Sequence, residues 1–311
     1  MPRTASVTGE SHAVTPGAAA IAGPAPEVCF GESGADARIG LPCPERAGIR
    51  NKNRHCGTFI GEDRLYERSA DKLRRSISVV IPAYNEENRL PSTLEKVQAY
   101  LRETPWEFTE VLVIDDGSRD GTVAAAEHAG ARVLRNPGNR GKGYSVRHGM
   151  LKAQGEWTLF TDADLSTPVE ELEKLWAASA RDHAKVAFGS RALDRSLVGV
   201  HQPVFRESMG RLFNFLMRVV TGLPFRDTQC GFKLFETAAA REIFQRQRLD
   251  GFGFDVEVLY IAAQLGYRMQ EVPVRWNDAA GTKVSMWRGV TAFLDPLKVR
   301  WNGITGKYKA S

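Results

Sequence analysis

The chain has 311 residues, of which 42% are hydrophobic and 25% are charged. This composition is typical of a soluble globular protein with one large domain, or one domain with extensions. The net charge of +5 is small and the basic residues form no dense stripe, which argues against a nucleic-acid-binding protein. No apolar run approaches the ~20 residues of a membrane-spanning helix, and the best candidate, FNFLMRVVTGL, is interrupted by Arg218.

The first 72 residues differ from the rest of the chain. They are rich in Gly, Ala, Pro, Ser and Arg, show no helical or strand periodicity, and lack the basic and apolar regions of a secretory signal. We expect 1–72 to be a disordered leader or a wrongly assigned start. The four cysteines form no close pair, which argues against zinc and favours reduced thiols in a cytosolic protein: Cys29, Cys43, Cys56 and Cys230.

Strands and helices alternate from about residue 73. Five runs rich in β-branched and apolar residues predict buried strands, at 77–86, 110–118, 131–136, 156–164 and 184–191. Helices are expected between them: one with a Ser92–Glu95 capping box, one ending at Gly130, one over 143–153 and one capped by Thr167. This alternation predicts an α/β fold with a doubly wound, mostly parallel sheet.

The C-terminal third is less regular. It contains a predicted helix near 206–220, the segment DTQCGFKLF (227–235), a predicted helix from about Phe254 to Leu265, and the extended segment MQEVPVRW. We place the main domain at 73–280 and treat 281–311 as a basic, aromatic tail.

Polar residues follow four of the five predicted strands. They are Asn85 and Glu86, Asp115 and Asp116, Asp162 and Asp164, and Arg191. Because ligands of open α/β sheets bind beyond the carboxyl ends of the strands, this pattern predicts a binding site at that edge.

Asp162 and Asp164 place two like charges close together in the segment FTDADLSTP. A hard divalent cation such as Mg²⁺ binds carboxylate oxygens and phosphates, and would offset the repulsion between the two side chains. The alternative is that one aspartate caps the following helix, which is disfavoured because Thr167 occupies the expected capping position.

Four ordered motifs within about 75–280 resemble the family 2 inverting glycosyltransferases, which have a nucleotide-diphospho-sugar transferase (GT-A) fold. The motifs are VVIPAYNEENRL, VLVIDDGSRDGT, NRGKGYSVRHGM and FTDADLSTP. Four further segments look most like those of dolichyl-phosphate β-glucosyltransferases and related polyprenyl-phosphate glycosyltransferases: GSRA, DTQCGFKLF, GFGFDVEVLYIA and EVPVRW.

The resemblance implies a nucleotide-diphospho-sugar donor, with UDP-glucose favoured over GDP-mannose, and Mg²⁺ or Mn²⁺ as cofactor. The metal would be held by the DxD pair, with Asn214 or Gln229 as a third ligand. Tyr84 would lie near the base, Asp116 would accept a hydrogen bond from it, and Lys142 would lie near the phosphates. The implied donor-binding residues are Pro82, Tyr84, Glu86, Ile114, Asp115, Asp116, Lys142, Asp162, Ala163 and Asp164.

The predicted acceptor is a polyprenyl phosphate. A phosphate, with a second pKa of about 6, is already anionic and needs cations rather than a general base. The resemblance assigns Arg191 and Arg206 to the acceptor phosphate, and Lys283 could close the site as a basic loop. We therefore assign the acidic residues Asp255 and Glu257 a positioning role.

Two other functions stay open. A saccharide-hydroxyl acceptor would need a base, for which Asp255 is the candidate. A non-catalytic nucleotide-sugar-binding protein is disfavoured by the intact DxD pair and Lys142.

A lipid acceptor also requires contact with a membrane. The segments RLFNFLMRVV and WRGVTAFLDPLKVRW mix apolar and basic residues, so they either lie in a lipid headgroup layer or pack on the core. We expect a protein at the cytoplasmic face of a membrane, bound peripherally.

Overall fold

The structure is a computed structural model that describes residues 76–200, 215–277 and 294–309. All of them belong to one compact unit, Thr58–Ser311. The predictions made for the 1–72 leader and for much of the C-terminal tail lie outside the described residues.

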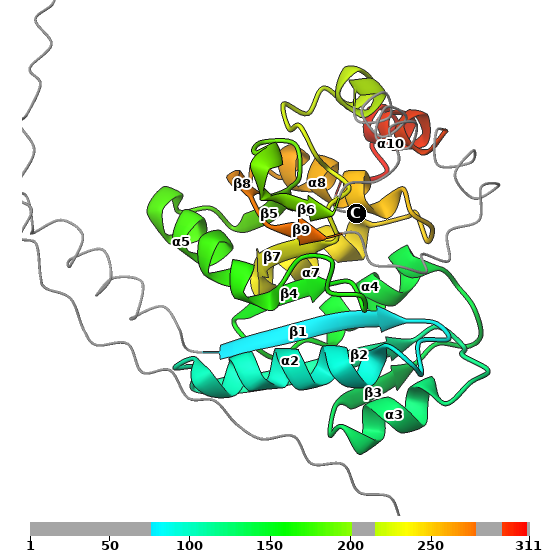
Figure 1. Cartoon of the computed structure of the whole chain (residues 1–311). Coiled ribbons are helices and arrows are strands. Elements are labelled where there is room, and N and C mark those ends of the chain that lie inside the picture. Colours follow the sequence, from blue (N-terminus) through cyan, green and yellow to red (C-terminus); the bar gives the residue numbers. More distant parts are fainter. Residues whose placement is uncertain (1–75, 201–214, 278–293, 310–311) are drawn as a thin grey trace, which may run out of the picture. The chain divides into compact units, whose positions relative to one another are not determined.

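A seven-stranded sheet has the order β3-β2-β1-β4-β7-β5-β8 (Figure 1). Six strands are mutually parallel, and β7 is antiparallel to its neighbours β4 and β5. The strands are β1 (Ser76–Ala83), β2 (Phe108–Asp115), β3 (Arg132–Arg135), β4 (Trp157–Thr161), β5 (Val186–Ser190), β7 (Phe232–Glu236) and β8 (Met269–Pro273). The short strands β6 (Val198–Val200) and β9 (Trp276–Asn277) pair separately. The predicted mostly parallel sheet is confirmed.

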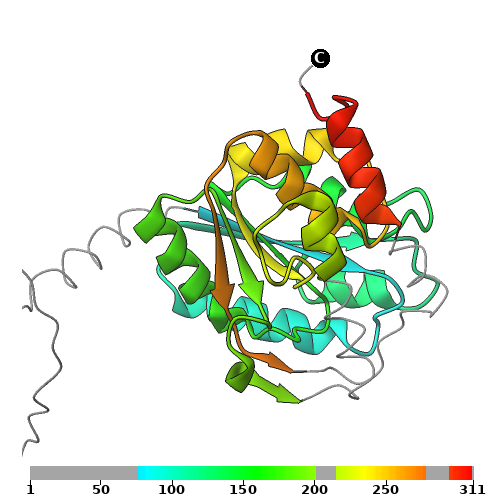
Figure 2. The same cartoon turned by 90° about the horizontal axis from the view of Figure 1, so that it is seen from above.

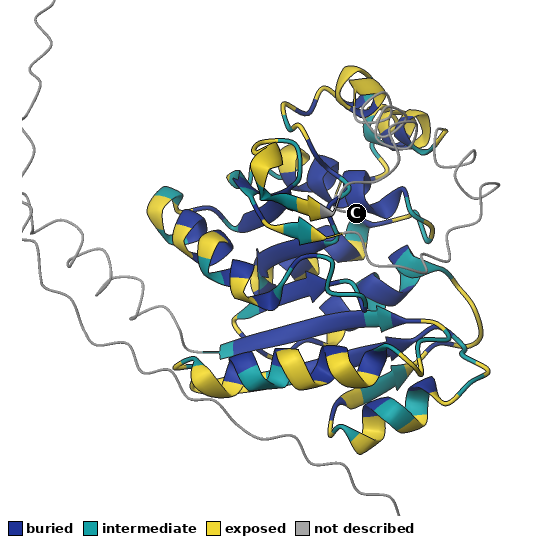
Figure 3. Cartoon of the chain, viewed as in Figure 1, coloured by how far each residue is buried: buried dark blue, intermediate teal, exposed yellow. Residues whose placement is uncertain are grey.

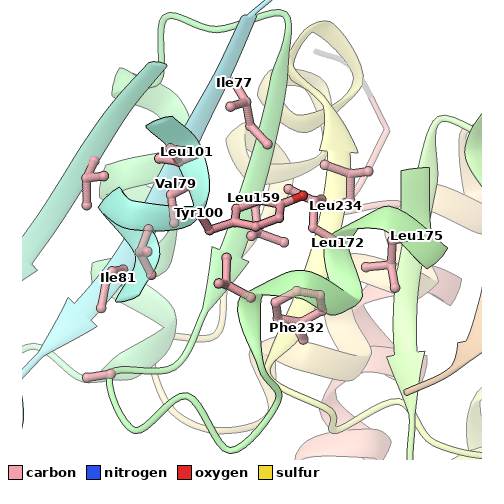
Figure 4. Packing of buried hydrophobic residues seen from close by; sticks show 14 of the residues in the cluster. Ile77, Val79, Ile81, Tyr100, Leu101, Leu159, Leu172, Leu175, Phe232 and Leu234 are labelled. Atoms are coloured by element: carbon pink, nitrogen blue, oxygen red, sulfur yellow. The ribbon is translucent and has the colours of Figure 1, made fainter. Parts of the chain in front are cut away.

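Helices cover both faces of the sheet because consecutive residues of the buried strands point to opposite sides. Val79 and Ile81 pack with α2 (Leu90–Glu103) and α5 (Leu172–Asp182), as Figure 4 shows at close range. Val80 belongs to a second buried cluster, to which α4 (Lys142–Lys152), α7 (Thr237–Arg246), α8 (Phe254–Gln264) and α10 (Asp295–Ile304) also contribute. Helix α3 (Thr122–His128) contributes Ala126 to the first cluster. Strands β1, β2, β4, β5 and β7 are accordingly buried along most of their length, whereas β3 and β8, at the two edges of the sheet, are not (Figure 3).

Two predicted helix caps are wrong. Helix α2 begins at Leu90, so Ser92 lies inside it and its hydroxyl donates to the Arg89 carbonyl oxygen at 3.1 Å. Thr167 is buried beside the Cys230 sulfur at 3.9 Å, and the 3₁₀ turn Val169–Glu171 that precedes α5 has no side-chain cap. Proline at the first turn starts α2 without a capping side chain.

Within the described ranges, no helix has both the length and the apolar character that crossing a bilayer requires.

Candidate active site

The loops that follow β1, β2, β4 and β5 lie at one edge of the sheet, as predicted. Residues Ala83 and Asp115 are register partners at the ends of β1 and β2, and the Asp116 amide donates to the Ala83 carbonyl at 2.9 Å. Because β7 is antiparallel, its start reaches the same edge, where the Gly231 carbonyl accepts a hydrogen bond from the Asp162 amide at 3.2 Å. The segment 227–231 therefore joins the predicted site.

Hydrogen bonds from backbone amides to side chains hold the loops after β1 and β2 together. The Ser118 amide donates to Asp115 Oδ1 at 3.1 Å, and the Ser118 hydroxyl accepts from the Asn85 amide at 2.9 Å. Beside them Tyr84 is 37% exposed, which leaves its ring accessible for stacking on a base. The Glu86 side chain pairs with Arg89 at 3.3 Å.

Asp116 is buried and already accepts three hydrogen bonds. They come from the Asn136 side chain at 2.8 Å and from the amides of Arg140 and Gly141 at 2.9 and 2.8 Å. A carboxylate accepts about four, so Asp116 chiefly holds the loop that leads into α4. Its predicted contact with the base stays a prediction.

Three predicted donor-binding residues contribute little side-chain surface to the edge. Ile114 is fully buried in the core and Pro82 is half-buried. Ala163 is buried, and its carbonyl accepts a hydrogen bond from the Thr93 hydroxyl at 2.6 Å. Any contact of Ile114 or Ala163 with a donor would involve mainly their backbone groups.

Two glycines bring the start of α4 against the loop before α8. Gly141 has a φ of +107°, and a side chain there would collide with the Asp250 carbonyl. Gly143 is equally confined by the carbonyls of Leu249 and Gly251. These close approaches fix the backbone on both sides of Lys142.

Lys142 spans the gap between α4 and β4. Its ammonium nitrogen lies 2.7 Å from Asp162 Oδ1 and 5.3 Å from the centre of the Phe160 ring. Burial disfavours the charged form, but the negative charges of Asp162 and Asp255 outweigh it and raise the pKa of Lys142. The side chain is therefore a fixed cation at the predicted phosphate position.

Asp162 and Asp164 can hold a divalent cation as a pair. The Asp162 side chain is 34% exposed. Its carboxylate occupies the space that a Cβ at position 231 would fill, so a glycine is needed there. Asp164 uses one oxygen to accept from the Ser166 amide at 3.0 Å, which leaves the other for a ligand. The described residues contain no group of three or more His, Cys, Asp or Glu suited to a metal, so a cation bound by this pair would need further ligands from elsewhere.

Arg191 is held by the carboxylate of Asp227, which is not among the predicted site residues. Asp227 accepts from the Arg191 guanidinium at 2.7 and 2.9 Å and from its amide at 3.1 Å. Burial disfavours the charged forms of both side chains. Their mutual attraction outweighs this effect, so the pKa of Asp227 is lowered and the pKa of Arg191 is raised. Arg191 also lies over the Trp276 ring at 5.5 Å. The other predicted acceptor residues, Arg206 and Lys283, and the candidate ligand Asn214 lie outside the described residues.

Asp255 and Glu257 are both buried inside the protein, although Asp255 lies near enough to Lys142 for its charge to raise the pKa of that lysine. Asp255 is 2% exposed and forms an ion pair with the fully buried Lys233, which also donates to the Cys230 carbonyl at 2.6 Å. Burial raises the pKa of Asp255 against the attraction of Lys233.

Glu257 is fully buried as well. It accepts from the amides of Arg248 and Leu249 at 3.1 and 2.8 Å and from the Tyr308 hydroxyl at 2.7 Å. It ties α8 to the loop before it and to the segment after α10.

Residues 78–244, more than half of the chain, match the family model described as Glycosyl transferase family 2. The chain belongs to this family. It is 41% identical over 233 residues to a dolichyl-phosphate beta-glucosyltransferase of Drosophila melanogaster, covering 69% of this chain and 71% of the relative. The corresponding Homo sapiens enzyme is 34% identical over 261 residues, covering 77% and 79%. The prediction of a glycosyltransferase is confirmed.

The fold of this glycosyltransferase is also that of a solved structure. Glucosyl-3-phosphoglycerate synthase from Mycobacterium tuberculosis, in complex with Mn²⁺, UDP and glucosyl-3-phosphoglycerate, matches with a TM-score of 0.57 and 19% identity over 84% of this chain and 88% of that chain. This confirms the GT-A fold.

The segment 227–233 of the glycosyltransferase contributes more to the site than its sequence indicated. Asp227, Gly231 and Lys233 hold Arg191, Asp162 and Asp255, respectively. Thr228 Oγ1 and Gln229 Nε2 are buried and have no hydrogen-bond partner among the described residues. The sequence signals for this segment were the resemblance of DTQCGFKLF to the family and the candidate ligand Gln229; neither indicated the contacts of Asp227, Gly231 and Lys233.

Proposed function

We propose that this glycosyltransferase moves glucose from UDP-glucose to a polyprenyl phosphate of the dolichyl type, with Mg²⁺ or Mn²⁺ as cofactor. The observation that carries the proposal is the pairing of Lys142 with Asp162, next to Asp164, at the carboxyl edge of the sheet. A divalent cation bound by the two aspartates would supply further positive charge to the donor diphosphate. The names of the relatives support glucose and dolichyl phosphate as the substrates.

The chain's own residues support each part of such a reaction. Tyr84 and Asp115 bind the nucleoside, and Lys142 binds the diphosphate and stabilises the negative charge that develops as UDP leaves. Arg191, oriented by Asp227, faces the acceptor phosphate.

Transfer is a single displacement with inversion. An oxygen of the acceptor phosphate forms a bond to the anomeric carbon, while the bond from that carbon to the UDP oxygen breaks and its electrons leave with UDP. No proton has to be removed from an ionised phosphate, so the site needs no general base. The burial of Asp255 and its ion pair with Lys233 support this acceptor over a saccharide hydroxyl. Since the acceptor is a lipid, the enzyme acts at a membrane surface, to which it binds peripherally.

The test is a donor screen with a short polyprenyl phosphate, scored by nucleotide release. UDP-glucose should be used in preference to GDP-mannose, and EDTA should abolish turnover until Mg²⁺ or Mn²⁺ is restored. Asp162→Asn and Asp164→Asn should each lower turnover by about 100-fold, whereas Glu103→Gln, on the exposed face of α2, should not. Preferred use of GDP-mannose, or turnover only with soluble saccharides, would refute the proposal.

A further inference from the structure

Exposed apolar side chains are concentrated on two short helices. Of the ten exposed large hydrophobic residues among those the structure describes, seven lie on helix 215–221 or at α10: Phe215, Leu216, Val219, Leu294, Leu297, Trp301 and Ile304. We call these seven residues the two-helix face. Its members are between 38% and 67% exposed, with Leu216 the least and Ile304 the most exposed.

The apolar residues of α10 form two separate stripes. Leu294, Leu297, Trp301 and Ile304 recur at intervals of three, four and three residues, which places them on one side of the helix. The opposite side packs on the protein, since Val299 is fully buried and Gly303 has no room for a side chain beside Tyr260. The exposed stripe is therefore not needed to attach α10 to the domain.

The two helices form one surface. They lie side by side in both views, with α10 in red and helix 215–221 in yellow-green (Figure 1 and Figure 2). Met217 and Val299, on their inner sides, belong to the same core cluster.

The two segments that carry this apolar surface have an excess of exposed basic residues. Residues 215–221 and 294–309 contain five basic residues and one acidic residue: Arg218, Lys298, Arg300, Lys307 and Lys309, against Asp295. Anionic lipid headgroups complement such an excess of positive charge, and a Trp among Leu and Ile is suited to the boundary between headgroups and acyl chains. A second copy of the chain would instead bring two surfaces with the same positive charge together, which costs free energy.

The surface is also connected to the active site. Asp295, at the start of α10, fills the space where a side chain of Gly253 would lie. The preceding loop residues Asp250 and Gly251 contact Gly141 and Gly143 on either side of Lys142. A membrane bound at α10 would therefore lie near the phosphate end of the donor site.

We propose that the two-helix face docks on an anionic lipid bilayer and so presents the active site to a membrane-embedded acceptor. The inference rests on the proposed lipid-phosphate acceptor for its purpose, but the docking itself can be measured without catalysis.

The test is flotation of the full chain with phosphatidylcholine vesicles, with and without phosphatidylserine. The wild type should bind the anionic vesicles, and added salt should weaken binding. The triple variant Leu297→Asn, Trp301→Asn, Ile304→Asn should partition about tenfold less, because it removes apolar area from the buried contact. The control Phe108→Asn changes an exposed aromatic residue at the start of β2 and should bind as the wild type does.

Transfer assays separate docking from chemistry. The triple variant should keep wild-type turnover with a short, water-soluble polyprenyl phosphate and lose turnover with a long-chain acceptor in vesicles. Equal vesicle binding by wild type and triple variant, or no binding by the wild type, overturns the inference. So does sedimentation showing a dimer that the triple variant converts to monomer while vesicle binding persists. If no lipid phosphate accepts glucose although vesicle binding depends on the face, the docking inference holds and the proposed function fails.

Discussion

The ammonium nitrogen of Lys142 lies 2.7 Å from a carboxylate oxygen of Asp162. The two residues come from different elements, α4 and the loop after β4, and their contact unites the predicted phosphate-binding and metal-binding parts of the site. In the absence of donor, each charge neutralises the other.

Replacement of Lys142 tests this arrangement. Lys142→Met should lower kcat/KM by about 100-fold, equivalent to about 2.7 kcal/mol, because the diphosphate loses a fixed cation. Lys152→Met, on the exposed last turn of the same helix, is the matched control and should retain activity. Steady-state kinetics with both substrates varied would measure the effect. A Lys142→Met enzyme with wild-type kcat/KM contradicts the assignment.

Gly231 should control the position of Asp162. A Cβ in Gly231→Ala would overlap the Asp162 carboxylate and push it from its place, so the affinity for UDP with Mn²⁺ should fall by about tenfold. Gly251→Ala is the control, because the space around its Cβ is open. Titration calorimetry measures both affinities. Unchanged binding by Gly231→Ala would show that the carboxylate position is unimportant.

The Lys233–Asp255 pair distinguishes a positioning role from a catalytic base. Lys233→Met should destabilise the fold by about 3 kcal/mol, because it leaves the Asp255 carboxylate buried without its partner. The double variant Lys233→Met, Asp255→Leu should recover most of this loss in urea unfolding. It should also keep measurable transfer to a lipid phosphate. A stable double variant without any transfer would favour Asp255 as the base.

The lowered pKa of Asp227 predicts that the stability of the protein depends on pH. Because its pKa is lowered in the folded state, the ionised pair with Arg191 stabilises the protein above the unfolded pKa of about 3.9, and this contribution is lost as the pH falls through the lower, folded value. Asp227→Asn should cost about 2 kcal/mol at neutral pH, and the difference from wild type should narrow below about pH 4. Urea unfolding at several pH values measures it, with Glu107→Gln, an exposed carboxylate, as the control. A difference independent of pH would contradict the pairing.

Replacement of Gln229 should separate an effect on transfer activity from an effect on stability. Its Nε2 is buried without a hydrogen-bond partner among the described residues, so Gln229→Leu should leave the free energy of unfolding unchanged or raise it by about 1 kcal/mol. If the amide binds substrate or metal, transfer should nevertheless fall by about tenfold. Thermal unfolding and kcat/KM together decide the matter. Lower stability with unchanged transfer would assign Gln229 a purely structural role.

The strands and the edge at which the site lies could be predicted from the sequence. The runs around Val80, Val113 and Phe160 are long, apolar and bounded by polar residues, and all three became buried parallel strands. The true starts of the helices near Ser92 and Thr167 could not be predicted from the sequence, because proline and tertiary packing determined where those helices begin.

By itself, the sequence determined the local elements, the DxD pair at the end of β4 and the family of the chain. Only the tertiary structure decided that β7 enters the sheet antiparallel between β4 and β5, which brings Asp227 to Arg191 and Gly231 to Asp162. It also decided that Asp255 is buried in an ion pair with Lys233, and that the stripe of α10 containing Leu297 and Trp301 faces outward. The physical reason is the distance along the chain over which each feature is determined. The periodicity of a segment depends on which of its own faces are buried, whereas strand order and charge pairing depend on segments far apart in the chain.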